Sequence, residues 1–227
     1  MTSPRASVDE RPDLDIASTL EPRLQAHAPA YPTGTVRGLL AGDRVTAPTR
    51  DALLGRLAVA PVTEPRFFAA DAFETLQTAC ARLIPQPDRS PPIDLAGGID
   101  ARLAAGKGDG WRYAAMPPDG VAFRRGLHGL DETAQVLFGS LFRHLDERCQ
   151  DEVLGLVQRG EAPGETWRTL PAARFFEEFL AETTESYYAH PLAQEEIGYV
   201  GMADAQGWTA IGLNEREAHE PRENAHE

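Results

Sequence analysis

The stretch that most constrains the fold runs from Ile93 to Asp131, where two helical patterns flank a loop rich in glycine. In the first pattern Leu95, Ile99 and Leu103 recur every four positions, so one face of a helix is apolar. An aspartate directly before that pattern predicts an N-terminal cap. The second pattern starts after two consecutive prolines, which favour a helix start. Each helix leaves an apolar face that further helices have to cover.

Helical spacing of apolar residues continues through most of the chain. It predicts helices within 34–58 (a short pair), 70–84, 134–145, 147–159 and 172–187. The Asp71-x-x-Glu74 pattern is typical of a capping box, and the apolar run 134–145 predicts a largely buried helix. The four prolines of 85–92 predict an extended link.

The periodicity therefore predicts an all-α fold, an irregular multi-helix bundle of about seven or eight helices with long glycine- and aromatic-rich loops. Residues 1–32 are polar and lack periodicity, which predicts an extended or disordered N-terminal arm. We expect residues 33–213 to form a single helical domain and 214–227 to form a polar tail. A chain of 227 residues is long enough for one domain with a substantial core.

The charge is strongly acidic and unevenly distributed. The net charge is -13, and from Asp146 onward there are 18 acidic and 6 basic side chains. This balance argues against nucleic acid or an anionic membrane as the partner. The acidic half is either a solvated face or a surface for a basic partner. Apolar runs stay well short of the length of roughly 18 residues that a membrane span requires.

The sequence carries no recognisable constellation for catalysis, cofactor binding or metal binding. The six histidines lack zinc-site spacing, and motifs for acyl transfer are missing. Cys80 falls on the apolar stripe of its predicted helix, so we expect a buried free thiol. A bridge between Cys80 and Cys149, or to a partner chain, stays open for an exported protein. We therefore expect no catalytic, cofactor-binding or metal-binding residues.

Two loops combine glycine with large aromatic side chains, one around residues 106–116 and one around 197–213. Glycine allows close backbone approach, while tyrosine, tryptophan and arginine concentrate at binding hot spots. These loops and the end of the last long helix give the predicted partner interface: Trp111, Arg112, Tyr113, Met116, Tyr188, His190, Tyr199, Met202 and Trp208. The alternative is that both loops fold onto their own domain and complete its core.

Several long motifs appear together in one order. They are D-L-A-G-G-I-D-A-R-L-A-A-G-K-G-D-G-W-R-Y-A-A-M-P-P-D-G from residue 94, R-R-G-L-x-x-L-D from 124, Y-Y-A-H-P from 187 and G-Y-V-G-M-A-D-A-x-G-W from 198. Over roughly 67–213 the chain resembles the gluconate 2-dehydrogenase subunit 3 family. The resemblance implies a mostly helical small subunit without a redox centre of its own, which helps a large flavoprotein to fold and in many members supplies its export signal.

The resemblance also implies the partner's chemistry. The large subunit would be an FAD-dependent oxidoreductase of the glucose-methanol-choline (GMC) type that oxidises a sugar, sugar acid or polyol. It would pass electrons to a cytochrome c or another acceptor. We therefore expect a non-catalytic accessory subunit that binds and stabilises this flavoprotein, with no cofactor in this chain.

Two alternatives come from other functional classes. One is a self-sufficient helical enzyme or small-ligand-binding protein, with a site formed by residues such as Tyr188, His190 and Arg112. The other is a helical oligomer with a scaffolding role. Residues 1–32 lack both an apolar signal core and a twin-arginine pair, so we expect a cytoplasmic location, with periplasmic co-export beside a signal-bearing partner as the alternative.

Overall fold

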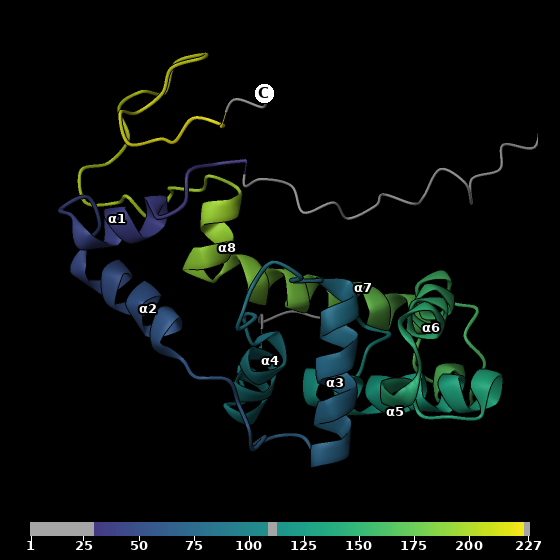
Figure 1. Cartoon of the computed structure of the whole chain (residues 1–227). Coiled ribbons are helices and arrows are strands. Elements are labelled where there is room, and N and C mark those ends of the chain that lie inside the picture. Colours follow the sequence, from purple (N-terminus) through teal and green to yellow (C-terminus); the bar gives the residue numbers. More distant parts are fainter. Residues whose placement is uncertain (1–29, 109–112, 225–227) are drawn as a thin grey trace, which may run out of the picture.

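The computed structural model describes residues 30–108 and 113–224, and every regular element in those ranges is helical (Figure 1). The α-helices are α1 Thr35–Ala41, α2 Ala47–Ala58, α3 Ala70–Leu83, α4 Leu95–Ala104, α5 Asp119–Phe138, α6 Glu147–Arg159, α7 Ala172–Tyr188 and α8 Pro191–Glu196. Two short 3-10 turns cover Phe142–His144 and Thr166–Arg168. The predicted all-α class is confirmed.

Aspartate side chains cap the starts of two helices, and the sequence analysis predicts the cap at Asp94. The Asp94 side chain accepts a hydrogen bond from the backbone N–H of Gly97 at 2.8 Å and starts α4. The Asp146 side chain does the same for Cys149 at the start of α6. That helix ends at Gly160, whose φ of 73° is the left-handed conformation that glycine adopts readily. In both N-terminal caps the aspartate and the backbone N–H that it accepts from are three residues apart.

The main hydrophobic core lies among α3, α4, α5, α6 and α7. Phe175 and Phe179 stack with ring centroids 5.8 Å apart, and Phe123 of α5 meets both rings edge to face. Cys80 is 3% exposed within this core and is free, as is the partly exposed Cys149. The prediction of a buried free thiol at Cys80 is thereby confirmed.

A second, smaller hydrophobic cluster holds the N-terminal helix pair, α1 and α2. Val36, Leu40 and Leu53 pack there against Val200 and Met202, which come from the segment after α8. Helix α8 contacts α1, α2 and α7, so it connects the helix pair with the main body. Figure 1 shows the pair at one end of the molecule, far from α5 and α6.

The capping box predicted at the start of α3 is wrong. The helix begins at Ala70 after Ala69, so Asp71 already lies inside its first turn. There its side chain accepts from the adjacent Ala72 N–H at 2.8 Å, and Glu74 forms an ion pair with Arg143 at 3.2 Å. A capping box needs its first residue outside the helix, and here the helix starts two residues too early.

The predicted helix at 134–145 also differs from the structure. Helix α5 begins at Asp119 and continues through Phe138 without a break, and Gly139 ends it with a φ of 68°. The backbone N–H of Phe142 then donates to Asp131 at 3.0 Å, which turns the chain back. Val136 is consequently 62% exposed and Leu137 39% exposed, so the run is not the buried helix that its composition predicts.

Helix α5 is the longest helix in the described part of the chain, with 20 residues, and it carries Arg124, Arg125, Asp131 and Glu132. A membrane-crossing helix needs about 20 predominantly apolar residues. None of the helices in the described ranges combines sufficient length with sufficient apolar character to cross a membrane.

Candidate functional site

The predicted interface residues separate into four groups: exposed aromatic residues, a half-buried histidine, two residues outside the described ranges and two buried methionines. Tyr113, Tyr188, Tyr199 and Trp208 keep between 40% and 49% of their surface exposed. His190 is half-buried at the start of α8. Trp111 and Arg112 lie outside the described residues, so the structure places only part of the first loop. The four exposed aromatic side chains come from both predicted loops and from the end of α7.

Met116 and Met202 are buried, although the sequence analysis places them in the predicted partner interface. Each is 6% exposed, Met116 in the main core and Met202 in the smaller cluster with the N-terminal helix pair. A side chain already enclosed by its own chain has no area left to offer a partner. For these two residues the alternative of a self-folded loop is the correct one, because flexible methionine fills irregular gaps in cores.

Two of the exposed tyrosines, Tyr113 and Tyr188, are held in place by contacts with their own chain. The guanidinium of Arg174 lies 3.8 Å from the ring centroid of Tyr113, a cation–π contact that ties the first loop to α7. The rings of Tyr187 and Tyr188 meet edge to face at 5.1 Å. Ordered aromatic side chains lose little conformational entropy when a partner covers them. They are therefore suited to molecular recognition.

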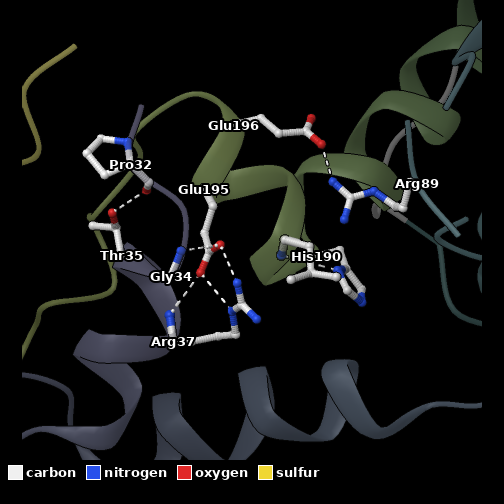
Figure 2. Close-up of polar contacts among 9 residues, drawn as sticks. Pro32, Gly34, Thr35, Arg37, Arg89, His190, Glu195 and Glu196 are labelled. Atoms are coloured by element: carbon white, nitrogen blue, oxygen red, sulfur yellow. Dashed lines mark hydrogen bonds and ion pairs between the residues drawn. The ribbon is translucent and has the colours of Figure 1, made fainter. Parts of the chain in front are cut away.

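Helix α8 forms a junction that local sequence patterns do not reveal (Figure 2). The Glu195 carboxylate accepts from the backbone N–H of Gly34 at 2.9 Å and of Arg37 at 3.1 Å. It also accepts from the Arg37 guanidinium at 3.2 Å. Burial raises the pKa of Glu195, but the hydrogen bonds from Arg37 and Gly34 outweigh burial and leave the pKa lowered. The charged carboxylate thus holds the start of α1.

Asp204 holds the start of α2 in the same manner. It accepts from the backbone N–H of Thr46 at 2.7 Å and from the Thr46 and Thr49 hydroxyls at 2.8 and 2.7 Å. The backbone hydrogen bond from Thr46 and the two hydroxyl hydrogen bonds lower the pKa of Asp204 to about 2. The segment around α8 therefore anchors both members of the N-terminal helix pair.

The other face of α8 is connected with the proline-rich link and with α7. Glu196 forms an ion pair with Arg89 of the link and accepts from the Tyr187 hydroxyl at 2.5 Å. Burial, followed by this hydrogen bond, raises the pKa of Tyr187 to about 12. His190 Nδ1 accepts from the Leu192 N–H at 3.3 Å, and burial, followed by the charge of Arg89, lowers the pKa of His190. His190 therefore caps α8 through its ring nitrogen.

Carboxylates of the motif segments have the same anchoring role in the main body. Asp100 is fully buried and accepts from the backbone N–H groups of Arg66, Phe67 and Phe68 at 2.7, 2.9 and 3.1 Å. Besides capping α4, Asp94 accepts from the Val62 N–H at 2.7 Å. Each carboxylate holds an irregular segment against a helix. Sequence reasoning missed Asp100, Glu195 and Asp204, whose partners lie 32 to 161 residues away.

The anchoring carboxylates Glu195 and Asp204 are poorly suited to proton transfer. A carboxylate that is already hydrogen-bonded and has a lowered pKa is a poor proton acceptor at neutral pH. The cavity between α4, α5 and α7 has a volume of about 40 Å³, room for a few water molecules. Ligand pockets usually occupy roughly 300–1,000 Å³, so this cavity is too small for such a ligand. A more open hollow of about 550 Å³ lies beside Asn214, Arg216, Arg222 and Glu223 in the C-terminal segment. Among residues 30–108 and 113–224, no cluster of three or more His, Cys, Asp or Glu side chains could hold a metal ion.

Comparison with known proteins gives one finding. The family model described as gluconate 2-dehydrogenase subunit 3 matches residues 70–213, from the start of α3 to the loop beyond α8. Neither the curated proteins nor the solved structures gave a match to this chain. The N-terminal helix pair lies outside the matched range, but Glu195 and Asp204, which anchor it, lie inside that range.

Proposed function

Because the chain belongs to the gluconate 2-dehydrogenase subunit 3 family, we propose that it is a non-catalytic small subunit that binds and stabilises a large FAD-dependent oxidoreductase of the GMC type. The large subunit oxidises a sugar, sugar acid or polyol, and it holds the FAD. Electrons leave through that subunit to a cytochrome c or another acceptor. This chain contributes a binding surface.

The observation that carries the proposal is that aspartates of the family motifs bind backbone N–H groups of other segments. Asp94, Asp100, Asp131 and Asp204 each accept hydrogen bonds from the backbone of another segment. The residues that an enzyme would need for proton transfer are thus engaged in holding loops, while ordered aromatic side chains remain at the surface. That combination supports a scaffold for binding.

Binding explains how such a subunit stabilises its partner. A protein that binds only the folded form of another shifts the partner's folding equilibrium by mass action, by about 2.7 kcal/mol when its concentration is 100 times the dissociation constant. The effect requires no chemistry in the smaller chain. It requires a surface that recognises the folded flavoprotein.

The test is to express the large flavoprotein subunit of the same organism with and without this chain. We expect soluble yield, bound flavin per protein and substrate-dependent electron transfer to fall when the chain is omitted. Equal values in both preparations would contradict the proposal. Turnover or retention of a small molecule by the purified chain alone would instead favour a self-sufficient enzyme or ligand-binding protein.

A further inference from the structure

The turn at residues 208–219 presents the most exposed large apolar side chains in the described ranges. Ile211 is 85% exposed and Leu213 is 94% exposed. A single exposed aliphatic residue is ordinary on a protein surface. Here two of them stand two positions apart on one turn, and Figure 1 shows this yellow segment extending away from the helices.

Hydrogen bonds accepted by two glutamate side chains fix the shape of this turn. Glu217 Oε1 accepts from the Ala210 N–H at 2.7 Å, from the Thr209 hydroxyl at 2.8 Å and from the Thr209 N–H. Glu215 accepts from the Gly212 N–H at 3.1 Å, between the two aliphatic residues. The exposed pair is therefore displayed on a preformed backbone, so binding would cost little additional ordering.

Both ends of the turn are fastened to the rest of the chain. The ring centroids of Trp208 and His219 lie 5.0 Å apart and close its base. Arg44, between α1 and α2, lies 3.4 Å from His219 Nδ1 and donates to Gln206 at 3.3 Å. The turn is thus attached to the N-terminal helix pair.

We propose that the 208–219 turn is a docking element that inserts Ile211 and Leu213 into an apolar pocket on the large flavoprotein subunit. This inference rests on the proposed function and names the part of this chain that carries it. After the aliphatic pair, Glu215, Glu217 and Glu220 outnumber Arg216, and the whole chain has a net charge of -13, so the complementary pocket carries basic side chains at its rim.

Charge also argues against two other binding partners for the turn, an anionic membrane and a second copy of this chain. Anionic lipid headgroups would repel the glutamates around the pair, because membrane-surface segments are normally basic. A second copy of this chain is acidic as well, and the charged lining of its cavity between α4, α5 and α7 is Asp119, Glu178, Glu182 and Glu185 with one arginine, Arg102. A basic-rimmed pocket on a different protein fits the turn better than either.

The test uses the complex of both subunits. A labelled wild-type chain bound to the large subunit is displaced by unlabelled wild-type chain, Ile211→Ser, Leu213→Ser, the double variant or Val136→Ser. Val136 is a matched control because it is 62% exposed on α5. We expect each turn variant to displace roughly 10- to 100-fold less effectively, since each loses the burial of one aliphatic side chain. Val136→Ser should stay within about twofold of wild type.

If the double variant displaces the labelled chain as effectively as the wild type does, the docking inference is overturned and the proposed function stands. Failure of the wild-type chain to bind the large subunit overturns both. Flotation of the wild type, but not of the double variant, with phosphatidylcholine–phosphatidylglycerol vesicles would assign the turn to a membrane and overturn the inference. Loss of a wild-type dimer in the double variant, measured by light scattering, would assign it to self-association and overturn it too.

Discussion

The Glu195 carboxylate and the Arg37 guanidinium meet at 3.2 Å, although 158 residues separate them in the chain. The glutamate side chain is 7% exposed, whereas that of the arginine is 54% exposed. The same carboxylate accepts the Gly34 and Arg37 backbone N–H groups. It therefore caps α1 from a distant helix, and the position of the N-terminal helix pair depends on it.

Replacing Glu195 with alanine should loosen α1 from α8. The change leaves two backbone N–H groups without their acceptor, which costs about 1–3 kcal/mol for each one that stays buried. Native-state hydrogen exchange should show faster exchange in 35–41, while α3 and α7 keep their protection. Glu165→Ala is a suitable control, because that side chain is 72% exposed in an ion pair with Arg168. Unchanged protection of α1 in Glu195→Ala would contradict the capping role.

Asp204 should make the attachment of α2 sensitive to acid. Its pKa falls from an ordinary 3.8 to about 2 in the folded protein. A lowered folded-state pKa means that the carboxylate stabilises the fold above about pH 4, and that this stabilisation is lost as the pH falls from about 4 to 2. We expect Asp204→Asn to be less stable than wild type in urea at pH 6, and the difference to shrink towards zero at pH 2. A difference independent of pH would rule out the charged form as its origin.

The sequence predicted the parts of this fold that depend on neighbouring residues. Asp94 and Asp146 are caps because the side chain and the N–H it accepts from lie three residues apart. The helical periodicity likewise identified the apolar faces of α3, α4 and α7, since those positions recur every three or four residues. Both features depend only on residues three or four positions apart, so a single sequence is enough to predict them.

The contacts that determine which residues lie at the surface join residues far apart in the sequence, and no local sequence pattern indicates them. Glu195 could not be distinguished from the other acidic residues of the C-terminal half, because its partners at α1 lie about 160 residues earlier. Met116 and Met202 looked like interface residues because glycine and aromatic residues surround them, but neighbouring helices cover them. Composition alone does not reveal which side of a loop faces the core. For the same reason it did not distinguish Ile211 and Leu213 from other apolar residues.

The two cysteines should differ in reactivity. Burial raises the pKa of Cys80 to about 12, so at pH 8 it is both enclosed and protonated. Cys149 is partly exposed, but its hydrogen bond with Asp146 raises its pKa, so its alkylation should be slower than that of free cysteine. Mass spectrometry after iodoacetamide should show one label per native chain and two in denaturant. Cys149→Ser should remain unlabelled until it unfolds, and two labels on the native wild type would contradict this assignment.

Gly126 of α5 lies against the Phe175 ring of α7, and an added side chain there should destabilise the core. A Cβ atom at Gly126 would lie 2.1 Å from the Phe175 ring, which is 1% exposed and stacked on Phe179. Alanine favours a helix over glycine by about 1 kcal/mol, but overpacking a well-filled core costs about 1–3 kcal/mol. The clash is far inside van der Waals contact, so we expect Gly126→Ala to lower the urea midpoint.

Gly98→Ala on α4 separates these two effects. The nearest atom to a Cβ there is Ser186 Oγ at 3.9 Å, so only the helix preference should act and stability should rise by about 0.5–1 kcal/mol. Phe175→Leu should cost less in the Gly126→Ala background than in wild type, because the smaller side chain relieves the clash, and a double-mutant cycle in urea measures that coupling. Gly126→Ala with a urea midpoint equal to or above that of wild type would show that α5 and α7 separate at little cost.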